Sequence, residues 1–257
     1  MTRKIQLLIL VVPSTFWLSS CDQILKMLET GVQESSLTQT EVVQGLKEAL
    51  ITGTNSSTTK LNAKDGYFKD PVAKILLPKE AQDIAENIRR IPGLGDKAMD
   101  DLLLRINRSA EDAAAEAKPI FINAVKNMTI SEGMNVLKGK SSQTTGFDST
   151  AATVYLKQKT YNDLFNAFQP KIDVSLDKKI VGNTSTNEAW AEITNLYNKV
   201  APILGKSKVN TELSGYVTEK ALEGLFYKIG EEEKSIRKNP YQYSKDILRK
   251  VFGSVHK

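Results

Sequence analysis

Apolar residues recur at helical spacing along most of the chain, and this pattern predicts an all-α protein. In residues 217–236 they return every three or four positions, and the pattern stops at Asn239-Pro240, a pair that breaks helices. The sequence shows no clear repeat with a period of about 20 to 50 residues, which argues against a solenoid. We therefore expect a single multi-helix, bundle-like domain with irregular connections over residues 38–253.

Start and stop signals divide this pattern into helices. The first helix is expected to begin with a capping box at Thr38-x-x-Glu41 and to stop at Gly53. A turn is expected at Asp65-Gly66, before an extended run over residues 73–77. Capping boxes are also expected at Thr129-x-x-Glu132, for a short helix that stops at Gly139, and at Ser185-x-x-Glu188. Further helices are expected over residues 81–88, 98–128 (with an end or kink at Pro119), 151–159, 160–168, 171–176, 217–236 and 247–252.

The N-terminus is typical of an exported protein. Arg3 and Lys4 precede a short apolar run over residues 5–18, which is too short to cross a bilayer of about 30 Å as a helix. The run ends in Leu18-Ser19-Ser20-Cys21, which resembles the lipobox of bacterial lipoproteins. We therefore predict a cleaved signal over residues 1–20, a lipid-anchored tether over residues 21–37 and a frayed C-terminus over residues 254–257.

Acyl chains on Cys21 would hold the mature protein on a membrane, facing the periplasm of a bacterial envelope. Asp22 follows the acylated position and resembles a signal for retention in the inner membrane, but the choice between inner and outer membrane stays open. The alternative is that Cys21 is an incidental thiol near the end of an ordinary signal peptide.

The composition excludes several classes of chemistry. The chain has one cysteine and one histidine, Cys21 and His256, so it lacks the residues for a disulfide, a zinc site, a Ser-His-Asp triad or a Cys-His pair. No cofactor or metal is expected. The formal net charge of +5 falls to about +3 without Arg3 and Lys4, and no window is persistently basic. Binding to nucleic acid is therefore not expected.

One short segment nevertheless resembles a nucleic-acid motif. Residues 88–98 (IRRIPGLGDKA) resemble the turn of a helix-hairpin-helix, in which backbone amides at a helix start approach a phosphate. Asp96 would place negative charge near that phosphate, and no second copy of the motif is present. We favour an ordinary hairpin turn over nucleic-acid binding.

A group of polar residues forms the main candidate site. Asn107, Arg108, Glu111 and Asp112 lie at helical spacings, so Arg108 can meet either acid and Asn107 can meet Glu111. The small residues Ala110 and 113–115 around them would allow another helix to approach closely. The group is either a partly buried polar seam or a solvated charged face beside an alanine packing face.

A second acidic group, residues 231–233, precedes Lys234 and Arg237. Glu233 and Arg237 stand at the favourable i, i+4 spacing, and we interpret them as an exposed salt bridge worth a few tenths of a kcal/mol. The alternative is a catalytic carboxylate pair for glycan cleavage, which needs one acid with a raised pKa across a cleft from another.

Several segments together resemble one known family. They are residues 45–50 (GLKEAL), 65–68 (DGYF), 110–114 (AEDAA), 118–121 (KPIF), 151–153 (AAT), 216–226 (YVTEKALEGLF) and 250–253 (KVFG). The chain resembles, over about residues 39–253, an uncharacterised bacterial envelope family, the domain of unknown function numbered four thousand one hundred ninety-seven. This resemblance implies an exported, mainly helical protein and brings no activity or catalytic residues with it.

Three hypotheses for the function follow. The favoured one is a non-enzymatic envelope protein that binds another protein or an envelope component through a helical surface or groove, which an exposed apolar patch would support. The second is an enzyme that uses carboxylates such as Glu111 or Glu232 on an envelope glycan or lipid, which a deep pocket with convergent acids would support. The third is nucleic-acid binding through residues 88–98.

Overall fold

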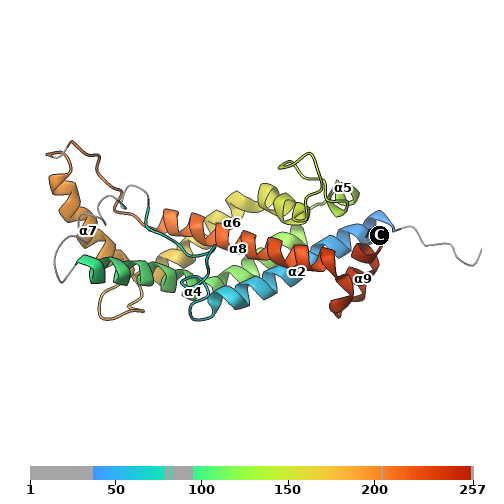
Figure 1. Ribbon diagram of the computed structural model, residues 1–257, viewed down its shortest axis with the longest axis horizontal. Helices are drawn as coiled ribbons and strands as arrows, with labels where there is room; N and C mark the ends of the chain where they lie inside the picture. Colours follow the sequence, from blue (N-terminus) through green and yellow to red (C-terminus); the bar gives the residue numbers. More distant parts are fainter. Residues whose placement is uncertain (1–36, 79–81, 83–94, 204, 256–257) are drawn as a thin grey trace, which may run out of the picture. The chain divides into compact units, whose positions relative to one another are not determined.

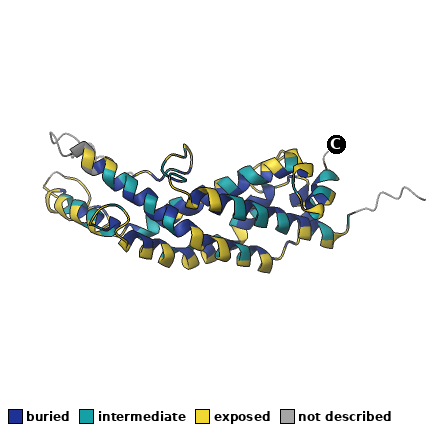
Figure 2. Ribbon diagram, turned by 90° about the horizontal axis from the view of Figure 1, so that it is seen from below, coloured by how far each residue is buried: buried dark blue, intermediate teal, exposed yellow. Residues whose placement is uncertain are grey.

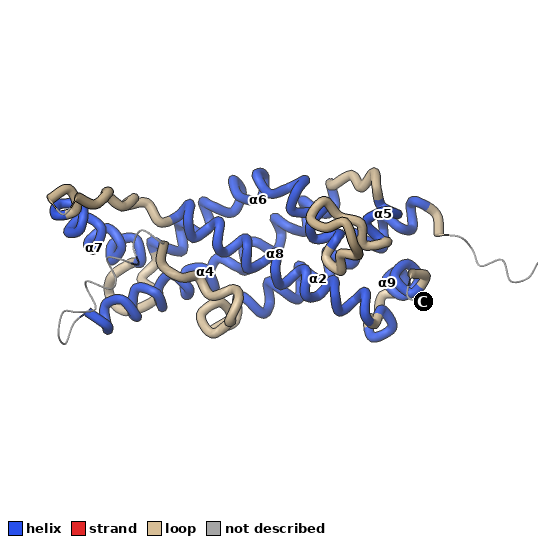
Figure 3. The backbone as a smooth tube through the Cα atoms, turned by 45° about the horizontal axis from the view of Figure 1, so that its top comes forward, coloured by secondary structure: helices blue, strands red, loops and turns tan. Residues whose placement is uncertain are grey.

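The computed structural model describes residues 37–78, 82, 95–203 and 205–255. Backbone contacts divide the chain into Met1–Thr38 and Gln39–Lys257, and the second unit holds almost all of the described residues. The described residues form helices and no strands (Figure 3). The elements are α2 (Gln39–Asn62), α4 (Gly95–Asn127), α5 (Gly133–Leu137), α6 (Ala151–Asp177), α7 (Thr186–Val200), α8 (Ser214–Lys238), η1 (Pro240–Gln242) and α9 (Asp246–Gly253). The all-α prediction is therefore confirmed.

Four long helices form a bundle. α2 packs against α4 and α8, and α6 packs against the same two helices, so that each of the four has two long neighbours (Figure 1). α9 packs across the first half of α2, and α7 contacts α4 and α6. The faces turned inward are buried along all four helices (Figure 2). Because the described chain holds no disulfide, this apolar core stabilises the bundle.

α2 begins directly after Thr38, as predicted, but it does not stop at Gly53. Gly53 lies against Ile229 of α8, and a Cβ atom there would stand 3.3 Å from the backbone oxygen of Ile229. The glycine therefore allows two helices to pack closely instead of ending one. α2 ends at Asn62, and the predicted turn follows at Asp65, whose φ is 70°.

The two prolines inside the long helices do not end them. α4 continues through Pro119, and α6 continues through Pro170, so the three short helices expected over residues 151–176 are one helix. Proline removes one backbone hydrogen bond from a helix and leaves the carbonyl four residues earlier without its donor. Pro119 and Pro170 are both exposed, as are Ala115 and Asn166, so water can reach the carbonyls that lose their donors.

The capping predictions had mixed outcomes. Ser185 and Glu188 form the predicted capping box of α7, with each side chain accepting a hydrogen bond from the backbone N–H of the other residue. The box predicted for Thr129 and Glu132 is wrong, because α5 begins at Gly133 with no side-chain cap from Glu132. The predicted break at Asn239-Pro240 is confirmed, since α8 ends at Lys238.

Several predictions fall on other parts of the chain. The signal, Cys21, Asp22, the tether before residue 37 and most of the expected helix over residues 81–88 lie outside the described residues. So does most of the hairpin over residues 88–98. Within the described residues, no helix has both the length and the apolar character needed to cross a membrane.

Candidate functional site

The polar seam predicted on α4 fastens the segment that follows α2. Asn107 and Glu111 are buried, Arg108 is nearly so, and Asp112 is partly exposed. The interpretation as a solvated charged face is therefore wrong for the first three residues. Side-chain spacing alone cannot show this burial, because the cover comes from residues 63–78.

Asn107 does not meet Glu111. Its Oδ1 accepts a hydrogen bond from the backbone N–H of Ile75 at 2.9 Å, and its Nδ2 donates to the carbonyl oxygen of the same residue at 2.8 Å. This is the pair of bonds that a neighbouring strand would make. Residues 74–78 belong to no helix or strand, and Ile75 is buried. Asn107 therefore supplies the hydrogen bonds that the buried backbone of Ile75 needs.

Glu111 uses both of its carboxylate oxygens inside the fold. Oε1 accepts hydrogen bonds from the backbone N–H groups of Tyr67 and Phe68 at 3.2 and 3.1 Å, and Oε2 lies 2.5 Å from Nη1 of Arg108. Nη2 of Arg108 lies 2.6 Å from Oδ1 of Asp65. Hydrogen bonds from Lys69 and Arg108 hold the pKa of Asp65 below its usual value. Both carboxylate oxygens of Glu111 thus accept hydrogen bonds from groups of the fold.

Asp112 faces another helix. Its Oδ2 accepts hydrogen bonds from Oγ of Ser175 at 2.7 Å and from Nζ of Lys178 at 2.5 Å, which ties α4 to the last turn of α6. The four seam residues therefore make two separate sets of contacts, and both sets join parts of the fold.

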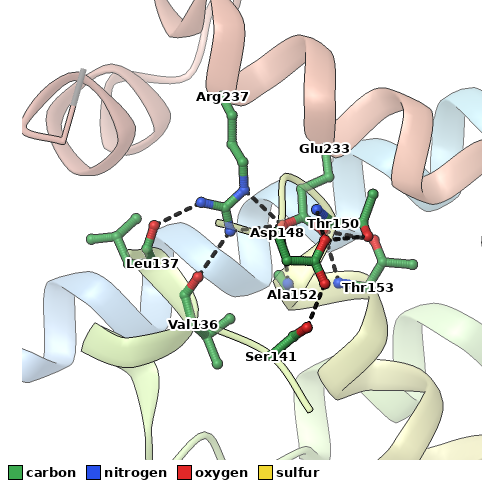
Figure 4. Close-up of polar contacts among 9 residues, drawn as sticks. All are labelled: Val136, Leu137, Ser141, Asp148, Thr150, Ala152, Thr153, Glu233 and Arg237. Atoms are coloured by element: carbon green, nitrogen blue, oxygen red, sulfur yellow. Dashed lines mark hydrogen bonds and ion pairs between the residues drawn. The ribbon is translucent and has the colours of Figure 1, made fainter. Parts of the chain in front are cut away.

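A second buried cluster surrounds Glu233 and Arg237 of α8 (Figure 4). We expected an exposed salt bridge, but the two side chains are only 1% and 6% exposed. Glu233 accepts hydrogen bonds from the backbone N–H groups of Ala152 and Thr153 at the start of α6, at 3.0 and 2.8 Å, and from Oγ1 of Thr153 at 2.7 Å. The prediction of exposure is therefore wrong, because the start of α6 covers Glu233.

Arg237 completes this cluster. It donates to Glu233 through Nε and Nη2 at 2.9 and 2.7 Å, and to the carbonyl oxygens of Leu137 and Val136 at 2.7 and 3.0 Å (Figure 4). Those carbonyls end α5. The carboxylate thus lies at a helix N-terminus and the guanidinium at a helix C-terminus, the placement that favours each charge.

Glu232 is also engaged. Its Oε1 accepts a hydrogen bond from the hydroxyl of Tyr243 at 2.9 Å, and its Oε2 accepts one from Oγ of Ser56 at 3.0 Å. Burial and this bond raise the pKa of Tyr243 to about 12. The described residues include no group of three or more His, Cys, Asp or Glu side chains that could hold a metal ion.

A hollow lies between α4 and α6. It measures about 570 Å³ and adjoins a second hollow of about 460 Å³ on the outer side of α6. The two share Lys159 and Asp163, and we name them together the α4–α6 groove. Its lining is Ile120, Asn123, Ala124, Asn127, Met128, Thr129, Ser131, Gln143, Val154, Tyr155, Lys157, Gln158, Lys159, Thr160, Tyr161, Asn162, Asp163, Leu164 and Ala167.

The groove is lined by amides, aromatic rings and lysines around an apolar floor. Nζ of Lys159 lies 5.6 Å from the ring centre of Tyr155, and Nζ of Lys157 lies 5.7 Å from that of Tyr161. Nδ2 of Asn127 donates to Oδ1 of Asn123 at 3.0 Å. The other amide atoms of this pair have no hydrogen bond within the described chain, so they are available to a ligand.

The chain matches one known protein family over nearly all of its described residues. Residues 36–253 match the family described as "Protein of unknown function (DUF4197)". The chain belongs to this family. The resemblance drawn from the sequence segments is therefore confirmed. No curated protein and no solved structure matches the chain.

The groove of this DUF4197 protein was not predicted from the sequence. Two signals were present, the asparagine pair Asn123 and Asn127 and the aromatic and cation pair Tyr155 and Lys159, each at i, i+4 spacing. Both pairs are common on solvated helices. Only the packing of α4 beside α6 brings them to one hollow.

Proposed function

We propose that this protein binds a polyhydroxylated component of the bacterial envelope, such as a glycan, in the α4–α6 groove, and that it does so without catalysing a reaction there. The observation that carries the proposal is the lining of the groove, in which amides and tyrosines surround one carboxylate, Asp163. A volume of about 570 Å³ falls in the usual range for ligand sites, about 300–1,000 Å³.

The lining suits hydroxyl groups. A side-chain amide can both donate and accept hydrogen bonds, and so can a hydroxyl group. The two groups can therefore pair with each other, and neither carries a net charge. Asn123 and Asn127 line the larger hollow of the groove, and Gln143, Gln158 and Asn162 line the hollow that adjoins it. The hydroxyl groups of Tyr155 and Tyr161, which also line the groove, add further groups that can both donate and accept hydrogen bonds.

The carboxylates argue against glycoside hydrolysis. That reaction ordinarily needs two acids, separated by about 5–9.5 Å, across the scissile bond. Asp163 is the one acid in the lining of the groove. Glu111 and Glu232, the acids considered for an enzyme, hold backbone N–H groups and hydroxyls inside the fold.

The membrane attachment is part of the same proposal. Acyl chains on Cys21 would hold the protein at an envelope membrane and facing the periplasm, with Asp22 as a sorting residue. An anchored binding protein would be held beside the envelope material that it binds.

Titration of the full-length protein with soluble fragments of envelope glycan tests the groove. The variant Asn127→Ala removes one amide from the groove, and Asn195→Ala removes an exposed helical asparagine from α7 as a matched control. We expect Asn127→Ala to weaken binding about three- to tenfold, the worth of one or two hydrogen bonds, and Asn195→Ala to leave it unchanged.

Equal affinities in the two variants, or no binding of glycan to the unsubstituted protein, would overturn the proposal. Cleavage of the fragments during the titration would favour the enzyme hypothesis instead.

A further inference from the structure

The end of α7 and the turn after it expose three aliphatic side chains. Leu196 and Val200 stand four residues apart on one side of α7 and are 61% and 46% exposed, and Ile203, in the turn that follows the helix, is 83% exposed. The opposite side of α7 packs on the bundle through Trp190 and Thr194, which are buried. We name Leu196, Val200 and Ile203 the apolar stripe.

The chain after α7 folds back along this helix. The backbone N–H of Lys206 donates to the carbonyl oxygen of Ala201 at 2.9 Å, and Gly205, with a φ of 66°, makes the turn. The side chain of Asn198 then pairs with the backbone of Val209 through two hydrogen bonds, of 2.9 and 2.8 Å. Residues 206–209 are therefore held beside the last turns of α7.

This arrangement gathers positive charge near the apolar stripe. Lys199, Lys206 and Lys208 are all exposed, and residues 193–211 contain no aspartate or glutamate. None of the three lysines forms a salt bridge with another described residue. We name the stripe and these lysines together the α7 tip.

We propose that the α7 tip docks on the surface of an anionic phospholipid bilayer. Aliphatic side chains would enter the boundary between headgroups and acyl chains, while the lysines stay among the phosphates, as in other interfacial helices. A protein partner fits the composition less well. Protein interfaces favour Trp, Tyr and Arg as their anchors and are depleted in lysine, whereas the tip offers three aliphatic residues and three lysines.

Docking of the α7 tip would also set the orientation of the bundle on the membrane. α7 lies at one end of the bundle, and the first turn of α2, which follows the predicted tether, lies at the other end (Figure 1). Contact at both ends would lay the bundle along the membrane. The inference rests on the membrane anchor of the proposed function but not on the α4–α6 groove, so loss of glycan binding would leave it untouched.

Tryptophan quenching in vesicles tests the docking. Full-length Ile203→Trp is reconstituted into vesicles with brominated acyl chains, made either of zwitterionic lipid alone or with one part in three of anionic lipid. Val72→Trp is the matched control, because Val72 is also aliphatic and is 55% exposed, but lies in the segment after α2. The unsubstituted protein gives the background from Trp190, the tryptophan that remains after cleavage of the signal. Flotation of each sample reports the anchor separately.

We expect Ile203→Trp to be quenched in the anionic vesicles above the level of Val72→Trp. This difference should fall in high salt and on replacing Lys199, Lys206 and Lys208 together by glutamine, because both changes weaken the attraction to phosphate. A protein that floats with the vesicles but shows equal quenching at both positions would overturn the docking while leaving the anchor intact. Cross-linking through residue 203 to a second copy or to another protein, without quenching, would also overturn it. A protein that does not float would overturn the anchor.

Discussion

Replacing Glu233 by glutamine should destabilise the fold strongly. The carboxylate of Glu233 accepts hydrogen bonds from two backbone N–H groups, one hydroxyl and two guanidinium nitrogens, and it is 1% exposed. Glutamine keeps the shape but removes the charge, and its NH₂ group cannot accept any of these bonds. Arg237 would then be a buried cation without its counter-ion.

The magnitude follows from this burial. Removing one partner of a buried ion pair costs about 3–5 kcal/mol, whereas an exposed pair contributes about 0–1 kcal/mol. Glu231, two residues earlier on α8, pairs with Lys234 at 2.6 Å, and both side chains are nearly half exposed. Glu231→Gln is therefore a matched control. A cost of about 3–5 kcal/mol corresponds to a fall in Tm of about 6–20 °C for a domain of this size.

The assay is denaturant and thermal unfolding of the full-length protein, followed by circular dichroism in one detergent for all variants. We expect a large shift for Glu233→Gln and a shift of less than about 0.5 kcal/mol for Glu231→Gln. The double variant Glu233→Gln/Arg237→Gln should cost less than the sum of its single variants, because the unpaired charge is removed. Equal shifts for the Glu233 and Glu231 variants, or strict additivity of the two single changes, would refute this reasoning.

Three further predictions concern a turn, the pH dependence and the anchor. Gly66→Ala should cost about 1–3 kcal/mol in unfolding experiments, since its Cβ would stand 2.3 Å from the backbone oxygen of Lys60, while Gly146→Ala should cost less than about 0.5 kcal/mol. Although burial alone would raise the pKa of Asp70, hydrogen bonds from Lys228, Ala73 and Val72 hold it below 3.8. Its contribution to stability is therefore full above pH 3.8 and is lost as the pH falls through the lowered value, so the unfolding midpoints of wild type and Asp70→Asn should converge below about pH 4. Cys21→Ser should abolish the acyl mass and release the protein from membranes, as measured by mass spectrometry and fractionation.

Local patterns predicted the features that local contacts create. The capping box of Ser185 and Glu188 and the break at Asn239-Pro240 need only neighbouring residues, and both were predicted correctly. Gly53 was misinterpreted as a helix end because its role depends on Ile229, far along the chain. The sequence pattern at Gly53 is the same in either role.

The candidate sites follow the same rule. The residues of the polar seam were identified from their spacing, but their burial depends on the turn at Tyr67 and Phe68, more than forty residues away. The burial of Glu233 depends on the first turn of α6, about eighty residues away. The charged residues could therefore be identified from the sequence, but their burial could not be predicted from it.

Native mass spectrometry of the protein, extracted gently from its own membranes, tests the central claim most directly. We expect an acylated chain that carries a small hydroxyl-rich ligand, and we expect Asn127→Ala to retain the acyl mass but to lose most of the ligand. An unacylated chain would contradict the anchor. An acylated chain with the same small mass in both variants, or with none in either, would contradict binding in the α4–α6 groove.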